Sequence, residues 1–172
     1  MSSRQVLYIG CSDWRVPESA VSTMLPGGIF VHRNIANQFH LDDDNALSVL
    51  AYAVEHLKVS HIIVAGHTLC GGAEAALAAA HASCPPPPPS GPLARWLVPL
   101  TEIAREYEDL TELIEANVRA QVNNVAGTDV VRAAWADNKR KLQVHGWIYD
   151  LGTGRFRDMG ISVDGPSKDD VL

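Results

Sequence analysis

The sequence predicts an α/β fold: a central, mostly parallel sheet flanked by helices, with a C-terminal antiparallel edge hairpin. Two short apolar runs, Val6–Ile9 and His61–Ala65, have the composition of buried strands. Segments with helical periodicity separate them, and strands that alternate with helices are typical of parallel sheets. A turn at Gly152–Gly154 between two further strand-like segments predicts the hairpin.

Caps and breakers place the remaining elements. Pro17 and Glu18 suit a first helical turn, and Asp42–Asp44 offer an N-cap and favourable charge to another helix. That second helix is expected to bury one face, made of Leu47, Leu50, Ala51, Val54 and Leu57. We also expect helices over residues 17–24, 73–82, 96–107, 110–125 and 129–135, with Asp129 capping the last, and strands over 29–31, 142–149 and 155–163.

Length and composition limit the class of protein. The 172 residues suit one domain, 1–172, and the net charge of −6 excludes the electrostatic footprint of a nucleic-acid-binding protein. No apolar run has the length of a membrane span, so no membrane partner is expected. Three cysteines without a disulfide framework predict reduced thiols and a cytoplasmic location, with an organellar address upstream as the alternative. Pro85–Pro89 predicts a stiff surface loop, or else a site for a proline-binding partner.

Two of the predicted strands end in residues that commonly bind metals. Cys11 follows the first strand, and His67 and Cys70 follow the strand over 61–65. Ligands of open α/β sheets bind at the carboxyl ends of strands, so these side chains converge if the strands are neighbours. Two thiolates and an imidazole suit zinc, and three protein ligands leave a fourth position open, as in catalytic sites. The alternative is that the cysteines simply fill the core.

Asp13 and Arg15 lie two residues apart, just after the first strand. On an extended segment their side chains point the same way, so a bidentate ion pair is feasible. Such a pair can merely hold a loop together. Beside a metal it can do more, because Arg15 would keep Asp13 ionised and Asp13 could accept a hydrogen bond from a zinc-bound hydroxide.

The segments Cys11–Arg15 and His67–Gly71, which read CSDWR and HTLCG, resemble the two signatures of the β-class carbonic anhydrase family. Residues 30–37, 51–55 and 144–150 resemble the family as well. The resemblance implies Zn²⁺ bound by Cys11, His67 and Cys70, with Asp13 as a fourth ligand in a closed state. It also implies that Gly71 offers a backbone N–H to the substrate, and that the chain forms a homodimer or a multiple of one.

By this resemblance the expected activity is that of a lyase: the reversible hydration of carbon dioxide to bicarbonate and a proton, by zinc-bound hydroxide oriented by the Asp13–Arg15 pair. Hydrolysis of carbonyl sulfide or carbon disulfide on the same scaffold is one alternative. A non-catalytic zinc-binding dimerisation module is another.

The sequence departs from the family pattern at several positions. Trp14 stands where the family usually has serine, and Tyr8 stands where one bicarbonate-inhibited branch has tryptophan. The family's helices ahead of the first strand are missing, and its substrate-binding glutamine would fall near Ser2, so we expect an active but less efficient enzyme. Cys84 is expected to be a bystander, and Arg33 to join a salt bridge rather than a substrate site.

Overall fold

The structure, a computed structural model of the 172-residue chain, describes residues 6–18, 27–82, 88, 90–137 and 141–165. Its centre is a sheet in the strand order β2-β1-β3-β4-β5, and β6 also pairs with β4. Strands β1 to β4 run parallel, whereas β5 and β6 pair antiparallel with β4, which confirms the predicted fold class. The strands are β1 (Val6–Cys11), β2 (Ile29–Asn34), β3 (His61–His67), β4 (Gln143–Asp150), β5 (Arg155–Asp158) and β6 (Val163–Asp164).

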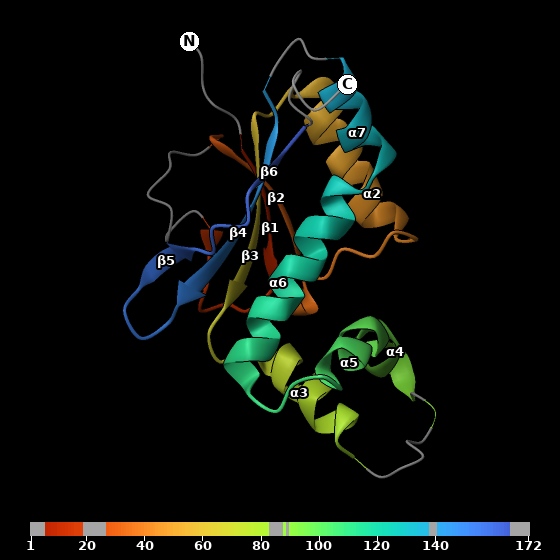
Figure 1. Cartoon of the computed structure of the whole chain (residues 1–172), viewed down its shortest axis with the longest axis vertical. Coiled ribbons are helices and arrows are strands. Elements are labelled where there is room, and N and C mark those ends of the chain that lie inside the picture. Colours follow the sequence, from red (N-terminus) through yellow and green to blue (C-terminus); the bar gives the residue numbers. More distant parts are fainter. Residues whose placement is uncertain (1–5, 19–26, 83–87, 89, 138–140, 166–172) are drawn as a thin grey trace, which may run out of the picture.

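Helices connect the strands, and α2, α6 and α7 lie on one side of the sheet (Figure 1). A short 3₁₀ turn, η1, follows β2, and a π-helical turn, η2, continues α2. The bounds are η1 (Ile35–Asn37), α2 (Asp44–Ala51), η2 (Tyr52–His56), α3 (Gly71–Ala80), α4 (Gly91–Trp96), α5 (Val98–Ala104), α6 (Leu110–Ala126) and α7 (Asp129–Ala136). None of the described helices is long and apolar enough to cross a membrane.

Three sequence-based expectations about elements are wrong in detail. The helix expected over 96–107 is two helices, α4 and α5, because Pro99 near the start of α5 has no N–H to continue the first ladder. The N-cap of α7 is Thr128 rather than Asp129, although its hydroxyl donates to the Val125 carbonyl at 2.7 Å instead of capping. The strand expected over 155–163 divides into β5 and β6 around a turn at Gly160.

The helix after Asp43 begins as predicted but buries a different face. The Asp43 side chain accepts a hydrogen bond from the Asn45 N–H at 3.0 Å, as an N-cap should. Leu50 and Val54 are buried as expected, whereas Ala46 and Ala53 are buried in addition and the other members of the expected face, Leu47, Ala51 and Leu57, are only half-buried. A π turn holds more residues than an α turn, so η2 rotates the face that meets the core.

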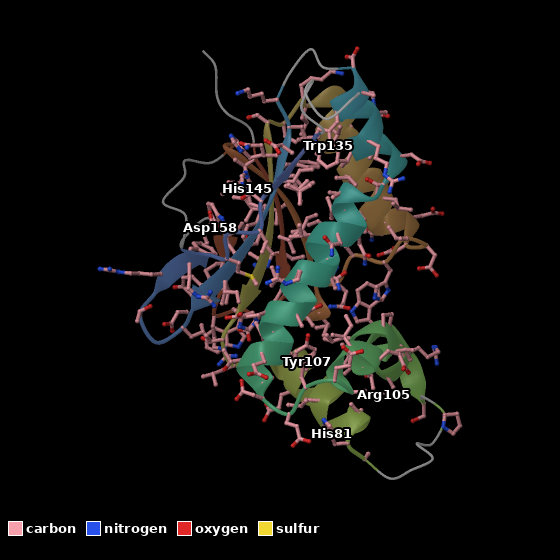
Figure 2. All side chains as sticks on the ribbon, in the orientation of Figure 1. His81, Arg105, Tyr107, Trp135, His145 and Asp158 are labelled. Carbon is pink, nitrogen blue, oxygen red and sulfur yellow. The ribbon has the colours of Figure 1, made fainter. Side chains whose placement is uncertain are left out.

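Helix α6 packs across β3 and β4 and closes the core behind the strand ends. Gly66 permits this approach, because a Cβ at that position would lie 2.6 Å from Val118 of α6. Trp135 of α7 anchors the other end of the helical layer by donating from Nε1 to the Leu142 carbonyl at 2.8 Å (Figure 2). The sheet is therefore tightly backed immediately before His67, where β3 ends.

Some expectations fall on residues that the structure does not describe. The helix over 17–24 and the Pro85–Pro89 loop lie in large part outside the described residues, and Ser2 and Cys84 lie wholly outside them.

Candidate active site

Three potential metal ligands meet at the carboxyl ends of β1 and β3. Cys11 is the last residue of β1, His67 is the last residue of β3, and Cys70 is the N-cap residue of α3. The two strands are parallel neighbours, so their ends lie side by side. The two sulfurs and one imidazole nitrogen all lie within 4.8 Å of one another, and all three residues are buried. The predicted convergence is therefore confirmed.

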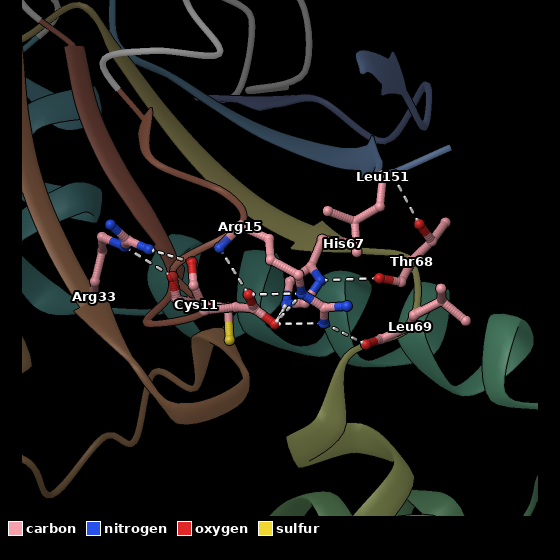
Figure 3. A network of polar contacts seen from close by, with 8 residues as sticks. Cys11, Arg15, Arg33, His67, Thr68, Leu69 and Leu151 are labelled. Carbon is pink, nitrogen blue, oxygen red and sulfur yellow. Dashed lines mark hydrogen bonds and ion pairs between the residues drawn. The ribbon is translucent and has the colours of Figure 1, made fainter. Parts of the chain in front are cut away.

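The imidazole of His67 is oriented for metal binding. Its Nδ1 lies 3.0 Å from the Thr68 carbonyl oxygen, which can only accept, so Nδ1 carries the proton (Figure 3). Nε2 then carries a lone pair, and this buried atom has no hydrogen-bond partner among the residues that the structure describes. A buried polar atom without a partner is costly unless something binds it, and a metal ion would satisfy it.

A contact between the two thiols shifts their pKa values in opposite directions. A hydrogen bond from Cys70 lowers the pKa of Cys11, even though burial opposes this, and the same contact together with burial raises the pKa of Cys70. The thiolate, and not the thiol, binds metal ions, so the lowered pKa of Cys11 favours metal binding. Two sulfurs and an imidazole nitrogen form a donor set that fits a borderline-soft metal ion.

Asp13 and Arg15 form the predicted bidentate ion pair. Arg15 Nε donates to Asp13 Oδ1 at 3.0 Å, and Arg15 Nη2 donates to Asp13 Oδ2 at 2.6 Å. The hydrogen bond from Arg15 holds the pKa of Asp13 down to about 2, so its carboxylate stays ionised at neutral pH. Asp13 Oδ2 also lies 3.9 Å from the unpartnered Nε2 of His67, which places the carboxylate beside the potential metal position.

The local geometry of this pair differs from the expectation. Residues 13–16 form a turn rather than an extended segment, because the Val16 N–H donates to the Asp13 carbonyl at 3.1 Å. The Arg15 N–H also donates to Asp13 Oδ1 at 2.9 Å, an Asx-type turn in which the carboxylate caps its own loop. The side chains meet because of this turn and not because of strand alternation.

The short loop between His67 and Cys70 is strained and tied down. Leu69 has a φ of 56°, a left-handed conformation that non-glycine residues rarely adopt. Its carbonyl accepts a hydrogen bond from Arg15 Nη2 at 3.0 Å, and Thr68 Oγ1 accepts one from the Leu151 N–H at 3.0 Å (Figure 3). Sequence reasoning gave Thr68 and Leu69 no role, because each contact uses a main-chain group: the Leu69 carbonyl in one and the Leu151 N–H in the other.

A family model described as carbonic anhydrase matches residues 6–156, which is most of the chain. The chain belongs to the carbonic anhydrase family. A carbonic anhydrase of Emericella nidulans is 38% identical over 95% of the chain and 72% of its own length. Among solved structures, a tetrameric β-carbonic anhydrase of Sordaria macrospora matches with a TM-score of 0.82 at 36% identity, over 94% of the chain and 83% of its own. A Coccomyxa β-carbonic anhydrase in complex with acetazolamide has the same TM-score at 34% identity, over 95% of the chain and 75% of its own.

The β-class resemblance is therefore confirmed. Two further residues adjoin the site residues in the chain, since Gly71 follows Cys70 and Trp14 lies between Asp13 and Arg15. Gly71 is the first residue of α3, where backbone N–H groups have no acceptor within the helix, and the space where its Cβ would point is open. Trp14, between the two members of the ion pair, leaves 85% of its surface exposed.

Arg33, on β2, forms the salt bridge that the sequence led us to expect, with Glu18 at 3.2 Å. It also donates to main-chain carbonyls of the loop that carries Cys11 and Asp13, and sequence reasoning missed these contacts. A carbonyl acceptor leaves no mark in the sequence, so no residue pattern could have revealed them.

Proposed function

We propose that the chain catalyses the zinc-dependent reversible hydration of carbon dioxide to bicarbonate and a proton. Cys11, His67 and Cys70 are the proposed zinc ligands. The observation that carries the proposal is the buried Nε2 of His67, which has no hydrogen-bond partner among the described residues and lies 3.9 Å from an ionised carboxylate, on a ring grouped with two buried thiols. Membership of a family of lyases makes the chain an enzyme. The two sulfurs and the imidazole nitrogen are atoms that suit zinc, which supports the choice of metal.

Zinc, when bound, lowers the pKa of a water molecule so that hydroxide is available near neutral pH. Asp13 is the proposed acceptor of that nucleophile's hydrogen bond, and its low pKa keeps it an acceptor across the working pH range. Arg15 holds the carboxylate in place through two side-chain hydrogen bonds. In a closed state, Asp13 itself would serve as the fourth ligand.

Gly71 is the proposed donor to the substrate, through its backbone N–H at the start of α3. The positive end of the helix dipole lies at this position and favours the developing negative charge of bicarbonate. The start of α3, next to the proposed ligand Cys70, would therefore bind both carbon dioxide and the bicarbonate anion.

We further propose that the chain is one domain over 1–172 and assembles as a homodimer or a multiple of it. One sheet contains strands from residue 6 to residue 164, which supports a single domain. The named tetramers of Sordaria macrospora support self-association. The strand register puts Val31 and Trp147 on one face of the sheet, opposite the face that meets α6. Val31 is 36% exposed and Trp147 is only half-buried, so apolar surface remains for a second copy.

Stopped-flow hydration of carbon dioxide, with zinc quantified on the same sample, tests the proposal. We expect one zinc per chain, activity that a chelator abolishes, and inhibition by acetazolamide. A parallel sulfide-release assay with carbonyl sulfide and carbon disulfide tests the alternative substrates. Zinc-loaded protein that accelerates none of these reactions would overturn the proposed activity and favour the zinc-binding dimerisation module.

A further inference from the structure

Arg33 reaches from β2 to the loop that follows β1. Its Nε donates to the Cys11 carbonyl at 2.8 Å, and its Nη2 donates to the Asp13 carbonyl at 2.6 Å (Figure 3). Its Nη1 pairs with Glu18 Oε2 at 3.2 Å. Its side chain is 23% exposed, so these contacts are partly shielded from water. One guanidinium therefore binds two carbonyls of the segment that carries both a potential metal ligand and the ionised carboxylate.

The geometry of this contact restricts the backbone. A guanidinium is a planar, rigid fork, and binding carbonyls two residues apart fixes the peptide orientations between them. A second tie, from the Ser12 N–H to the Asn34 carbonyl at 2.8 Å, holds the middle of the same segment against β2. The directions in which the Cys11 sulfur and the Asp13 carboxylate leave the backbone follow from those peptide orientations.

Two arginines thus divide the work at this loop. Arg15 binds the carboxylate of Asp13, whereas Arg33 binds the main-chain carbonyls of Cys11 and Asp13 and pairs with Glu18. We propose that Arg33 is a positioning residue: it holds Cys11–Asp13 in the conformation that presents the sulfur to the metal and the carboxylate to the reacting position. The part of this inference that concerns zinc and turnover rests on the proposed function.

Two substitutions and a matched control test the inference. Arg33→Met removes the fork, and Arg33→Lys keeps the charge and a salt bridge to Glu18 but can bind only one carbonyl with comparable geometry. Glu18→Gln breaks the salt bridge and leaves both carbonyl contacts. The zinc dissociation constant is measured by competition with a chromophoric chelator, and the cobalt-substituted proteins report thiolate coordination through their absorption bands.

We expect both Arg33 variants to bind zinc about 10- to 100-fold more weakly, as is usual when a partner of a ligand is removed. Their cobalt spectra should change, and kcat should fall more than KM changes, because Asp13 is misplaced relative to the reacting atoms. Glu18→Gln should stay within about twofold of the parent in zinc affinity and kcat. Fold and melting temperature are recorded for every variant, so a general loss of stability is recognised.

Arg33→Lys decides the outcome if Arg33→Met does not fold. A lysine variant with parental zinc affinity, cobalt spectrum and kcat overturns the inference, even if its melting temperature falls, since that pattern is purely structural. A Glu18→Gln variant that loses as much zinc affinity as Arg33→Lys overturns it as well, because the salt bridge would then be the cause. If the parent protein binds zinc without hydrating carbon dioxide, the proposed function fails while the zinc comparison still tests the positioning role.

Discussion

Strand β3 carries a histidine at each end, and the ring nitrogens of the two differ in their hydrogen-bond partners. His61 and His67 are six residues apart and therefore lie on the same face of the strand. At the amino end, His61 Nδ1 lies 3.0 Å from His145 Nε2, and His145 Nδ1 lies 2.7 Å from Ser162 Oγ. His145 lies on β4 (Figure 2). At the carboxyl end, Nε2 of His67 is buried, and none of the described residues forms a hydrogen bond with it.

The difference shows how one fold separates stability from chemistry. At the amino end, the neighbouring parallel strand supplies a matching side chain, so the histidine pair is satisfied within the protein. At the carboxyl end, the chain leaves the sheet in loops, and those loops bring two thiols and a carboxylate to His67, whereas no hydrogen-bond donor from the described residues reaches its Nε2. Open α/β sheets bind ligands at this end for the same reason.

The largest expected effect comes from replacing each of the two histidines separately. His67→Gln should weaken zinc binding by more than about 100-fold, since even indirect partners of a ligand are worth 10- to 100-fold. His61→Gln should leave zinc stoichiometry and affinity unchanged, because that ring belongs to the satisfied pair. Metal analysis and chelator competition on both variants check this. Equal zinc content in the two proteins would contradict the ligand assignment.

The next effect separates metal binding from catalysis at the carboxyl end. Asp13→Asn should keep one zinc per chain but lose about 100-fold or more in hydration rate, the range typical of a lost acid–base group. The amide can donate where the carboxylate only accepts, and Arg15 loses its ionic partner. Stopped-flow assays on zinc-quantified protein measure this. Activity within twofold of the parent would mean that the ion pair only shapes the loop.

A smaller effect concerns the satisfied pair at the amino end. Burial, and then the proximity of His61, lower the pKa of His145, while Asp158 opposes them. As pH falls through about 6.5, His145 takes up a proton more readily in the unfolded chain than in the folded protein. The free energy of unfolding is therefore higher above that pH and decreases below it. His145→Gln should reduce this loss by up to about 1.4 kcal/mol per pH unit.

Urea unfolding at pH 7.5 and pH 5.5, with parent and variant compared at equal zinc, measures that slope. Some acid sensitivity should remain in the variant, because burial also lowers the pKa of His32 and of His40. An unchanged slope in His145→Gln would show that the pair does not contribute to acid sensitivity.

The smallest expected effect is that of Trp14→Ser, which restores the residue usual in the family. With 85% of the tryptophan surface exposed, the free energy of unfolding should change by less than about 0.5 kcal/mol. We expect kcat/KM to stay within about threefold of the parent. A larger loss, or a change of assembly in light scattering, would place Trp14 in contact with substrate or with a second copy.

Much of the site could be predicted because its residues have strong chemical preferences. The apolar runs before Cys11 and His67 predicted two strands, and parallel pairing of those strands was enough to bring these two side chains together. The Asp13–Arg15 pair was predictable from charge and spacing, although for the wrong local reason. The split of α4 from α5 was also within reach of the sequence, since Pro99 marks it.

The sequence by itself thus determined the class of fold, the donor set and the ion pair, because these depend on residue type and short spacing. Only the tertiary structure decided how the loops are held: the turn at Asp13, the left-handed Leu69 and the grip of Arg33 on two carbonyls. The physical reason is that every residue carries a carbonyl acceptor. Contacts with the main chain depend on where the chain passes in space, and the side chain at that position does not encode them.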